Sequence, residues 1–408
     1  MDGNNVCDGE AGLKTNAIGL NIRFVSALHH IEGFPGLMSE RLRILFITRK
    51  FPPSVGGMER LSYQLITHLR AHVDMRAITW GRSQCLLPWF LLGALIQGLV
   101  QARDVNLIHA GDPLVAPVVL ILSRLYRLPT VVNVHGLDLT FNFPGYQVLM
   151  PRLLCRFTRV VCISQTTYIE ALARGIAPER CRIIHPGVNI PETLLPRAEA
   201  RFLIELLLGT SLKGKQIWLT VGRLVARKGV AWFCEQVLPH LRETGGFIYL
   251  IAGDGPEASR LRAIVNALGL KGCVYLLGRV SDADLSVLYT GADAFIMPNI
   301  PQPHDLEGFG LVAVESAAYG LPVIAARLDG IQDAVIEGAS GYLLPPQDTR
   351  AWVAFLRRCL AEPQMLEELR SRAQDAVRER FSWDKILGHY LTLFHEVLTE
   401  WHKNNEVV

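Results

Sequence analysis

The feature that most constrains the fold of this chain is the alternation of short apolar runs with longer segments of helical periodicity. The runs have the length of strands, and Gly- or Pro-containing loops separate several of them from the next helical segment. This alternation is typical of a parallel sheet with helices on both faces. It occurs in two successive series within 408 residues, a length that favours two domains over one.

The first series begins near residue 41. Its expected strands are 43–48, 104–110, 130–135, 159–164 and 182–185, with helices at 58–69 and 165–174. The second has expected strands at 217–221, 247–252, 274–277, 294–297, 322–325 and 341–344, with helices near 230–241, 257–268, 282–289, 310–319 and 331–336. Helices 350–361 and 364–380 follow. Ser382-Trp383 then opens a last amphipathic helix, whose apolar face must pack on another element.

These patterns divide the chain into four expected segments. Residues 1–40 lack a sustained period and are rich in Gly and Asn, which predicts a poorly ordered extension. Residues 41–190 and 191–380 form two doubly wound α/β domains, joined by a Pro-containing connector at 186–196. Residues 381–408 carry the last helix.

Charge and cysteine content exclude several classes of protein. The 41 Lys and Arg residues against 38 Asp and Glu give a net charge of +3 without a basic block, so we expect no nucleic-acid partner. The eight cysteines form no C-x-x-C pair and mostly lie in apolar runs, which predicts reduced, structural thiols. The polar N-terminus does not resemble a signal peptide, so we expect a cytoplasmic protein.

Residues 85–100 form an almost wholly apolar segment, which is short for a membrane span of about 20 residues. One interpretation is a buried helix, or a helix with one strongly apolar face. The other is a helix that lies in the plane of a membrane surface, which would suit a lipid-linked acceptor.

The loops after the expected strands are where ligands of open parallel sheets bind. In the first half, Gly56-Gly57-Met58-Glu59 offers close backbone approach and helix amides, although such loops also simply turn the chain. His135-Gly136-Leu137-Asp138 brings an imidazole to the end of a strand; a structural histidine is the alternative.

The second half carries the stronger motifs. Gly222-Arg223 and Arg227-Lys228-Gly229 place fixed cations beside a helix start, which suits a diphosphate, unless they are solvated loop charges. Glu307 is followed by a Gly-rich loop and, eight positions on, by Glu315, so that helix amides can meet an anion and carboxylates can meet sugar hydroxyls. This loop is Gly308-Phe309-Gly310-Leu311.

One further motif is better explained as the start of a helix than as a metal-binding site. Asp282-Ala283-Asp284 matches the D-x-D pattern of metal-dependent sugar transferases, but Ser281 before it favours a capped helix start. No other cluster suggests a metal site. The positive side chains would then have to neutralise a leaving diphosphate.

Together these motifs resemble the retaining glycosyltransferases of family 4, which have the GT-B fold of two Rossmann-like domains facing across a cleft. The resemblance covers roughly residues 41–400, and the motifs occur in the order that this family shows. They are the G-G-x-E motif 56–59, the histidine loop 135–138, H-P-G-V-N at 185–189, G-R-x-x-x-x-K-G at 222–229, G-x-G-P at 253–256 and E-G-F-G-x-x-x-x-E at 307–315.

The resemblance implies a hexosyltransferase that retains anomeric configuration without a metal ion or other cofactor. Its second domain would bind a nucleotide-diphosphate sugar, a UDP- or GDP-hexose, and its first a glycan or lipid-linked acceptor in cell-surface polysaccharide or glycoconjugate synthesis. Arg223 and Lys228 would hold the diphosphate, while Glu307 would contact the hexose and Glu315 the ribose. His135 would lie beside the transferred sugar. Gly57 and the amides after Gly310 would approach the phosphates, and the last helix would cross back onto the first domain.

Two departures from the family pattern concern the pocket rather than the cations. The stretch 298–307 is longer than usual, and Gln332-Asp333 replaces a Pro-Glu pair. Alternative functions are epimerisation or phosphorolysis on the same fold, and a catalytically silent nucleotide-sugar-binding subunit. A dinucleotide oxidoreductase is disfavoured because no G-x-G-x-x-G follows the first strand.

Overall fold

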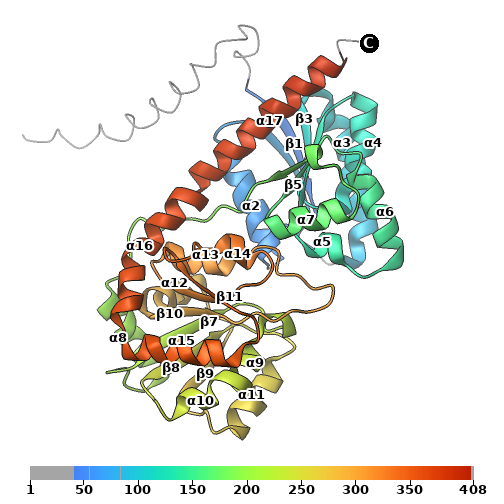
Figure 1. Cartoon of the computed structure of the whole chain (residues 1–408). Coiled ribbons are helices and arrows are strands. Elements are labelled where there is room, and N and C mark those ends of the chain that lie inside the picture. Colours follow the sequence, from blue (N-terminus) through green and yellow to red (C-terminus); the bar gives the residue numbers. More distant parts are fainter. Residues whose placement is uncertain (1–40, 55, 83, 406–408) are drawn as a thin grey trace, which may run out of the picture. The chain divides into compact units, whose positions relative to one another are not determined.

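The structure is a computed structural model that describes residues 41–54, 56–82 and 84–405 (Figure 1). The predicted extension at 1–40, with Cys7, lies outside the described residues. The six cysteines from Cys155 to Cys359 are free thiols, and four of them are buried.

The first sheet has six parallel strands in the order β2-β1-β3-β4-β5-β6. They are β1 (Arg43–Thr48), β2 (Asp74–Thr79), β3 (Leu107–Ala110), β4 (Thr130–Val134), β5 (Arg159–Cys162) and β6 (Cys181–Ile183). The strand β2 was not among the expected strands, because an edge strand that carries Asp74, Arg76 and Thr79 lacks an apolar run. The strand β3 begins later than the expected strand 104–110, since Ala102–Asp104 forms a 3₁₀ turn.

Helices cover both faces of this sheet. Buried side chains of α3 (Leu87–Gln101), α4 (Ala116–Tyr126) and α6 (Pro144–Leu154) pack with one set of strand residues. On the other face lie α2 (Gly57–Leu69) and the last helix, α17 (Trp383–Asn405). The short α5 (Leu137–Thr140) and α7 (Gln165–Ala173) follow β4 and β5.

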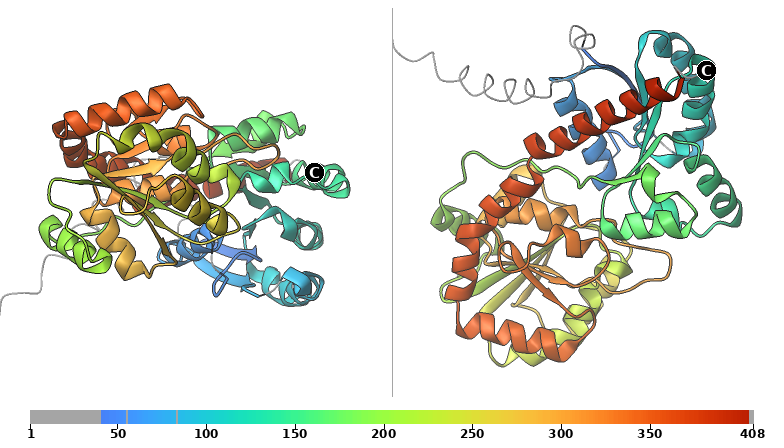
Figure 2. Two further views of the ribbon diagram at one scale, coloured as in Figure 1. Left: turned by 90° about the horizontal axis from the view of Figure 1, so that it is seen from below. Right: turned by 45° about the horizontal axis from the view of Figure 1, so that its top comes forward.

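The helix α17 joins the end of the chain to the first sheet (Figure 2). The Trp383 ring stacks on His68 of α2, with 4.8 Å between ring centroids. About two helical turns further on, the Tyr390 hydroxyl accepts a hydrogen bond of 3.0 Å from the Asn133 side chain of β4. The apolar face that the sequence predicts after Trp383 is therefore buried against α2 and β4.

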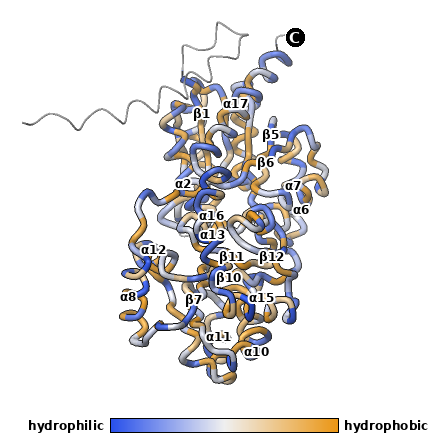
Figure 3. Tube along the Cα trace, turned by 60° about the vertical axis from the view of Figure 1, so that its left-hand side comes forward, coloured by the Kyte–Doolittle hydropathy of each residue, from blue (hydrophilic) through white to orange (hydrophobic). Residues whose placement is uncertain are grey.

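The second sheet also has six parallel strands, in the order β12-β11-β10-β7-β8-β9. They are β7 (Gln216–Val221), β8 (Phe247–Ala252), β9 (Val274–Gly278), β10 (Ala294–Met297), β11 (Val323–Ala326) and β12 (Gly341–Leu344). The helices are α8 (Arg197–Leu208), α11 (Ala258–Ala267), α12 (Asp282–Gly291), α13 (Leu311–Ala318), α14 (Ile331–Ala334), α15 (Thr349–Ala361) and α16 (Gln364–Phe381). Apolar residues alternate with hydrophilic ones throughout both halves (Figure 3), as two separate sheet cores require.

The helix expected at 230–241 is interrupted. It consists of α9 (Val230–Trp232), a π turn at Phe233–Val237 and α10 (Pro239–Arg242). Pro239 has no amide to donate, and the amide of Leu238 instead reaches the Phe233 carbonyl five residues back. The widened turn thus accommodates a proline inside the helical segment.

The apolar segment 85–100 forms a 3₁₀ turn and then α3. Phe90, Ala94 and Gly98 are buried on one side of this helix, whereas large apolar side chains on its other side are exposed. The first interpretation, a buried helix or a helix with one strongly apolar face, therefore accounts only for the side that packs on the sheet. Among the described helices, none has the length and apolar character needed to span a membrane.

Candidate active site

The strand order of the second sheet brings two loops together. The chain enters this sheet at β7, which lies between β10 and β8, so the connections run in opposite directions on its two sides. A crevice opens at such a switch point beyond the carboxyl ends of the strands. The loop 222–229 follows β7 and the loop 298–310 follows β10, and these two loops carry the strongest sequence motifs.

The two loops are joined by an ion-pair network with a largely buried centre. The Lys228 Nζ atom lies 2.7 Å from Glu307 Oε2, and both side chains are only 12% exposed. Arg227 also pairs with Glu307, and its Nε atom lies 3.1 Å from Asp305 Oδ1. The Asn299 amide donates a 2.9 Å hydrogen bond to the same Glu307 oxygen.

The network favours the ionised form of Glu307. Burial opposes ionisation of Glu307, but attraction to Lys228 and Arg227 and the hydrogen bonds from Lys228 and Asn299 outweigh it, so the pKa of Glu307 is lowered. Burial also lowers the pKa of Lys228, although the attraction to Glu307 acts in the opposite direction. An ionised carboxylate is therefore favoured where the two loops meet, 2.7 Å from the Lys228 nitrogen.

Three residues of this network were not among the predicted site residues. Arg227 was noted as a loop cation, but Asn299 and Asp305 lie in the long stretch 298–307, whose contacts the motifs do not fix. The Asn299 Oδ1 atom is buried without a hydrogen-bond partner among the described residues. Asp329 supports the loop by accepting a 3.1 Å hydrogen bond from the Glu307 amide. The sequence signal that could have identified Asn299 as a site residue is its position two residues after the end of β10, where ligands of parallel sheets bind.

Arg223 is placed differently from Lys228. Its side chain is exposed, and within the described part of the chain it forms no hydrogen bond or ion pair. Arg227, not Arg223, thus joins Lys228 at Glu307. The Arg223 guanidinium remains available to a ligand.

The Gly-rich loop of the second half touches the histidine loop of the first. A Cβ atom added to Gly308 would lie 2.2 Å from the His135 carbonyl oxygen, so only glycine permits this approach of two backbones. A second link is a 3.2 Å hydrogen bond from Thr140 Oγ1 to the His304 carbonyl. His135 and Glu307 therefore belong to adjoining loops.

The imidazole of His135 is buried and partly engaged. Its Nε2 atom lies 3.0 Å from the Gly111 carbonyl oxygen, which accepts a hydrogen bond from it in the tautomer that carries the hydrogen on Nε2. The Nδ1 atom is buried and has no partner among the described residues. Asp138 accepts a hydrogen bond from the His135 amide, and burial raises the pKa of this carboxyl group.

The start of α13 follows directly. Gly310 has a φ of 89°, a left-handed conformation that glycine adopts without strain, and it caps the helix. Phe309 is buried and stacks on His185, with 5.3 Å between centroids. Leu311 lies within contact range of Gly57, because a Cβ atom there would be 3.5 Å from Leu311 Cδ1. The G-G-x-E and E-G-F-G motifs thus converge.

In the G-G-x-E motif, Gly56 and Glu59 have an internal structural role. The Glu59 carboxylate pairs with Lys50 at 2.9 Å and folds back over Gly56, where a Cβ atom would lie 2.3 Å from it. A larger residue at position 56 would displace this carboxylate.

Glu315 lies on α13, away from the Lys228–Glu307 pair. It lies 3.4 Å from Arg60 of α2, and burial raises the pKa of its carboxyl group despite this cation. A cavity of about 160 Å³ is lined by Arg60, Leu311, Glu315 and residues of the 187–189 segment. The two glutamates of the motif therefore occupy opposite electrostatic environments.

The D-x-D segment is a helix cap, as predicted. The Ser281 hydroxyl accepts a 3.1 Å hydrogen bond from the Asp284 amide and donates one of 2.7 Å to its carboxylate. Among the described residues, no group of three or more His, Cys, Asp or Glu side chains is arranged to hold a metal ion.

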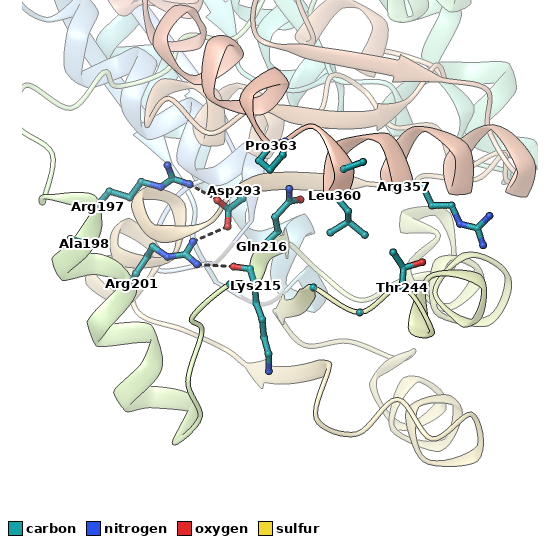
Figure 4. A pocket seen from close by; sticks show the side chains of 14 residues that line it. Arg197, Ala198, Arg201, Lys215, Gln216, Thr244, Asp293, Arg357, Leu360 and Pro363 are labelled. Carbon is teal, nitrogen blue, oxygen red and sulfur yellow. Dashed lines mark hydrogen bonds and ion pairs between the residues drawn. The ribbon is translucent and has the colours of Figure 1, made fainter.

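Another cavity, of about 700 Å³, lies at the amino end of the second sheet (Figure 4). Two of its three arginines, Arg197 and Arg201, pair with Asp293, which also accepts a 2.6 Å hydrogen bond from the Ile217 amide. This cavity lies at the edge opposite the motif-bearing loops, and its charges anchor α8 to the sheet.

Two sheets with this topology define the GT-B class of folds, and a solved structure shares it. The crystal structure of Anabaena Alr3699/HepE in complex with UDP and glucose aligns with a TM-score of 0.71 and 21% identity, over 87% of this chain and 100% of that chain. At this identity the likeness shows the fold.

Sequence families give the narrower assignment. The model described as Glycosyltransferase Family 4 matches residues 55–191, and the one described as Glycosyl transferases group 1 matches residues 215–362, together more than half of the chain. The chain belongs to the family 4 glycosyltransferases.

Two curated relatives show how far the similarity extends. The D-inositol 3-phosphate glycosyltransferase of Acidothermus cellulolyticus is 34% identical over 236 residues, which is 55% of this chain and 50% of that protein. The amylovoran biosynthesis glycosyltransferase AmsK of Erwinia amylovora is 26% identical over 260 residues, 63% of this chain and 61% of AmsK. The chain thus spans between half and two thirds of their lengths.

Proposed function

We propose that this glycosyltransferase moves a hexose from a nucleotide-diphosphate sugar to a glycan or a lipid-linked acceptor, with the donor bound by the second half of the chain and the acceptor by the first. The observation that carries the proposal is the set of cations on the loop after β7, at the β7/β10 switch point. Lys228 and Arg227 pair with carboxylates of the loop after β10, whereas Arg223 is exposed and has no side-chain partner among the described residues. A diphosphate would supply the negative charge that Arg223 lacks.

The donor's diphosphate would bind Lys228 and the exposed Arg223, together with the amides at the start of α13. These fixed charges would stabilise the negative charge that grows on the leaving diphosphate as the glycosidic bond breaks. Gly57 leaves room for the phosphates beside Leu311. Because cations carry this role, we propose that transfer needs no metal ion or other cofactor.

The sugar would occupy the space between Glu307 and His135. Glu307 is an ionised acceptor for hexose hydroxyls, and the buried, unpartnered Nδ1 atom of His135 is free to bind one of them. Glu315 would accept hydrogen bonds from the ribose hydroxyls. Retention of anomeric configuration is part of the proposal, since it is the stereochemistry implied by the resemblance to the retaining family 4 enzymes.

The donor and the pathway are supported by the relatives. HepE was crystallised with UDP and glucose, which favours a UDP-hexose over a GDP-hexose. AmsK acts in amylovoran biosynthesis, which favours cell-surface polysaccharide or glycoconjugate synthesis. Nucleotide sugars of this kind would meet the enzyme in the cytoplasm.

A donor screen tests the proposal. Purified protein is heated with UDP-, GDP- and ADP-hexoses, and the sugar that raises Tm is then tested for turnover with and without EDTA. We expect a UDP-hexose to raise Tm, turnover to survive EDTA, and NMR of the product to show the donor's anomeric configuration. A protein that none of these sugars stabilises would contradict the donor assignment.

A further inference from the structure

The helices α3, α4 and α6 pack side by side on one face of the first sheet and leave an unusually apolar outer surface. We call this surface the α3–α4–α6 face. Its exposed apolar residues are Trp89, Leu92, Ile96, Val100, Ile121, Leu125, Val148 and Leu149. Single exposed apolar residues are normal, but a contiguous group of large ones indicates a surface that contacts something apolar.

On α3 the exposed residues form a stripe. Trp89, Leu92, Ile96 and Val100 follow one another at spacings of three, four and four residues, so they lie along one side of the helix. Trp89 is 71% exposed and Val100 66%. The sheet-facing side is apolar as well, and no residue of α3 is charged. Packing on the sheet therefore explains only one side of this helix.

The charges in and just after the three helices are mostly positive. The helices α3, α4 and α6 contain no acidic residue, and exposed arginines lie in or just after them. These are Arg103, Arg124, Arg127, Arg152 and Arg156. Among the described residues, none of these five forms an ion pair, whereas the neighbouring exposed Asp104 is already 3.8 Å from Arg76. Arg124, Arg127 and Arg156 line a cavity of about 1240 Å³.

The helix α8 provides an internal contrast. Leu206 and Leu207 are 63% and 60% exposed, so this helix also shows apolar residues to solvent. However, α8 contains Glu199 and Glu205, and its two arginines pair with Asp293. Of these two surfaces, the α3–α4–α6 face is the one that combines an apolar stripe with arginines that form no ion pair among the described residues.

We propose that the α3–α4–α6 face binds the surface of a bilayer that contains anionic phospholipid. The apolar stripe would enter the boundary between headgroups and acyl chains, while the arginines would meet the lipid phosphates. A second copy of the chain fits less well, because a two-fold contact through this face would bring unpaired arginines against each other. The inference does not rest on the proposed donor or acceptor, although a lipid-linked acceptor would be reached from such a surface.

Sedimentation with vesicles tests the inference on the full chain. Vesicles of phosphatidylcholine alone are compared with vesicles of equal parts phosphatidylcholine and phosphatidylglycerol. We expect the protein to sediment with the anionic vesicles, less so at high salt and much less with phosphatidylcholine alone. Protein that stays in the supernatant with both kinds of vesicle overturns the inference.

Three double variants separate the contributions. Trp89→Ser/Ile96→Ser should weaken binding to anionic vesicles about 10-fold or more, because two large apolar side chains are lost. Arg124→Gln/Arg156→Gln should weaken it by a similar factor and remove the preference for anionic lipid. The matched control Leu206→Ser/Leu207→Ser, on α8, should bind as the wild type does.

Two outcomes would count against the bilayer specifically. Equal losses in the α8 control and the α3 variant would mean that general stickiness, rather than this face, causes sedimentation. Light scattering that shows a dimer disrupted by Trp89→Ser/Ile96→Ser, without vesicle binding by the wild type, would assign the face to a second copy. An unchanged Tm and circular dichroism spectrum show that each variant is folded.

Discussion

Both sheets carry charged side chains at their switch points, but these charges are paired differently in the two sheets. In the first sheet, Arg49 follows β1 and Asp112 follows β3, and the guanidinium Nε lies 3.0 Å from the carboxylate. Asp112 is fully buried and also accepts hydrogen bonds from Thr48, the Arg49 amide and the Leu114 amide. Every charge there has its partner inside the protein.

The second sheet has the same geometry but a different pairing of its charges. Lys228 and Arg227 pair with Glu307, Arg227 also pairs with Asp305, and Arg223 is exposed without a side-chain partner among the described residues. Removing one partner of a buried ion pair leaves an uncompensated charge inside the fold, whereas an exposed, unpaired cation attracts an anion from outside. The comparison therefore predicts that mutations at the first switch point mainly change stability and those at the second mainly change activity.

The largest expected effect is on folding, at the first switch point. Asp112→Ala leaves the Arg49 guanidinium, which is 10% exposed, without its counter-ion. We expect the free energy of unfolding to fall by about 3–5 kcal/mol, measured by urea denaturation. Asp104→Ala is the control, because its exposed, 3.8 Å pair with Arg76 should contribute about 0–1 kcal/mol. Similar losses in both would contradict the assignment.

At the second switch point the expected effect is on turnover. Lys228→Ala removes the buried cation proposed to stabilise the leaving diphosphate, and kcat should fall about 10²–10³-fold while the protein stays folded. The control is Lys215→Ala, which changes a lysine just before the amino end of β7, in the same sheet. Retained turnover in Lys228→Ala would be incompatible with the proposed site.

The contact between the two loops should have an intermediate effect. Gly308→Ala places a Cβ atom 2.2 Å from the His135 carbonyl oxygen, so one of the two backbones must move. We expect a loss of about 1–3 kcal/mol in stability together with reduced turnover. Gly93→Ala on α3, where nothing lies within 4 Å, should instead be neutral or stabilising by up to ~1 kcal/mol. Thermal unfolding of both variants decides this.

The smallest expected effects are the pH dependences of the two motif glutamates, which have opposite signs. The pKa of Glu307 is lowered, so its charge adds stability above the usual value of 4.5 and this contribution is lost as pH falls below it. The pKa of Glu315 is raised by burial, so its ionisation costs stability as pH rises above 4.5.

Gln substitutions at positions 307 and 315 allow the opposite contributions of the two glutamates to stability to be measured. At pH 7, Glu307→Gln should be less stable than the wild type, and Glu315→Gln should be more stable. Both differences should shrink as pH is lowered below 4.5. Urea midpoints of the two variants across this range check the signs, and shifts in the same direction would contradict the different environments assigned to them.

Most of the fold could be predicted from the sequence, because most strands of both hydrophobic cores are visible as short apolar runs. The strand β8, for example, was predicted with its observed bounds, since all six of its residues are buried. The strand β2 was missed because an edge strand needs only one buried side, and Asp74 and Arg76 conceal its pattern. The π turn before Pro239 depends on the missing backbone N–H of this proline. Helical periodicity reflects side-chain hydropathy, so it does not reveal such a turn.

The motifs predicted which residues belong to the candidate site, but they did not predict which of those residues form ion pairs with each other. Lys228 and Glu307 carry motif positions, and the sheet topology brings their loops together. Which arginine joins them depends on loop geometry, and Arg227 rather than Arg223 faces Glu307. Asn299 lies in a stretch of unusual length, so no spacing rule could assign its contact with Glu307.

The most direct test of the account is a crystal structure of the protein with UDP. The account predicts the diphosphate at the β7/β10 switch point, in contact with Lys228 and Arg223 and near the first amides of α13. A diphosphate bound at any other edge of either sheet, with Lys228 still paired only to Glu307, would contradict it.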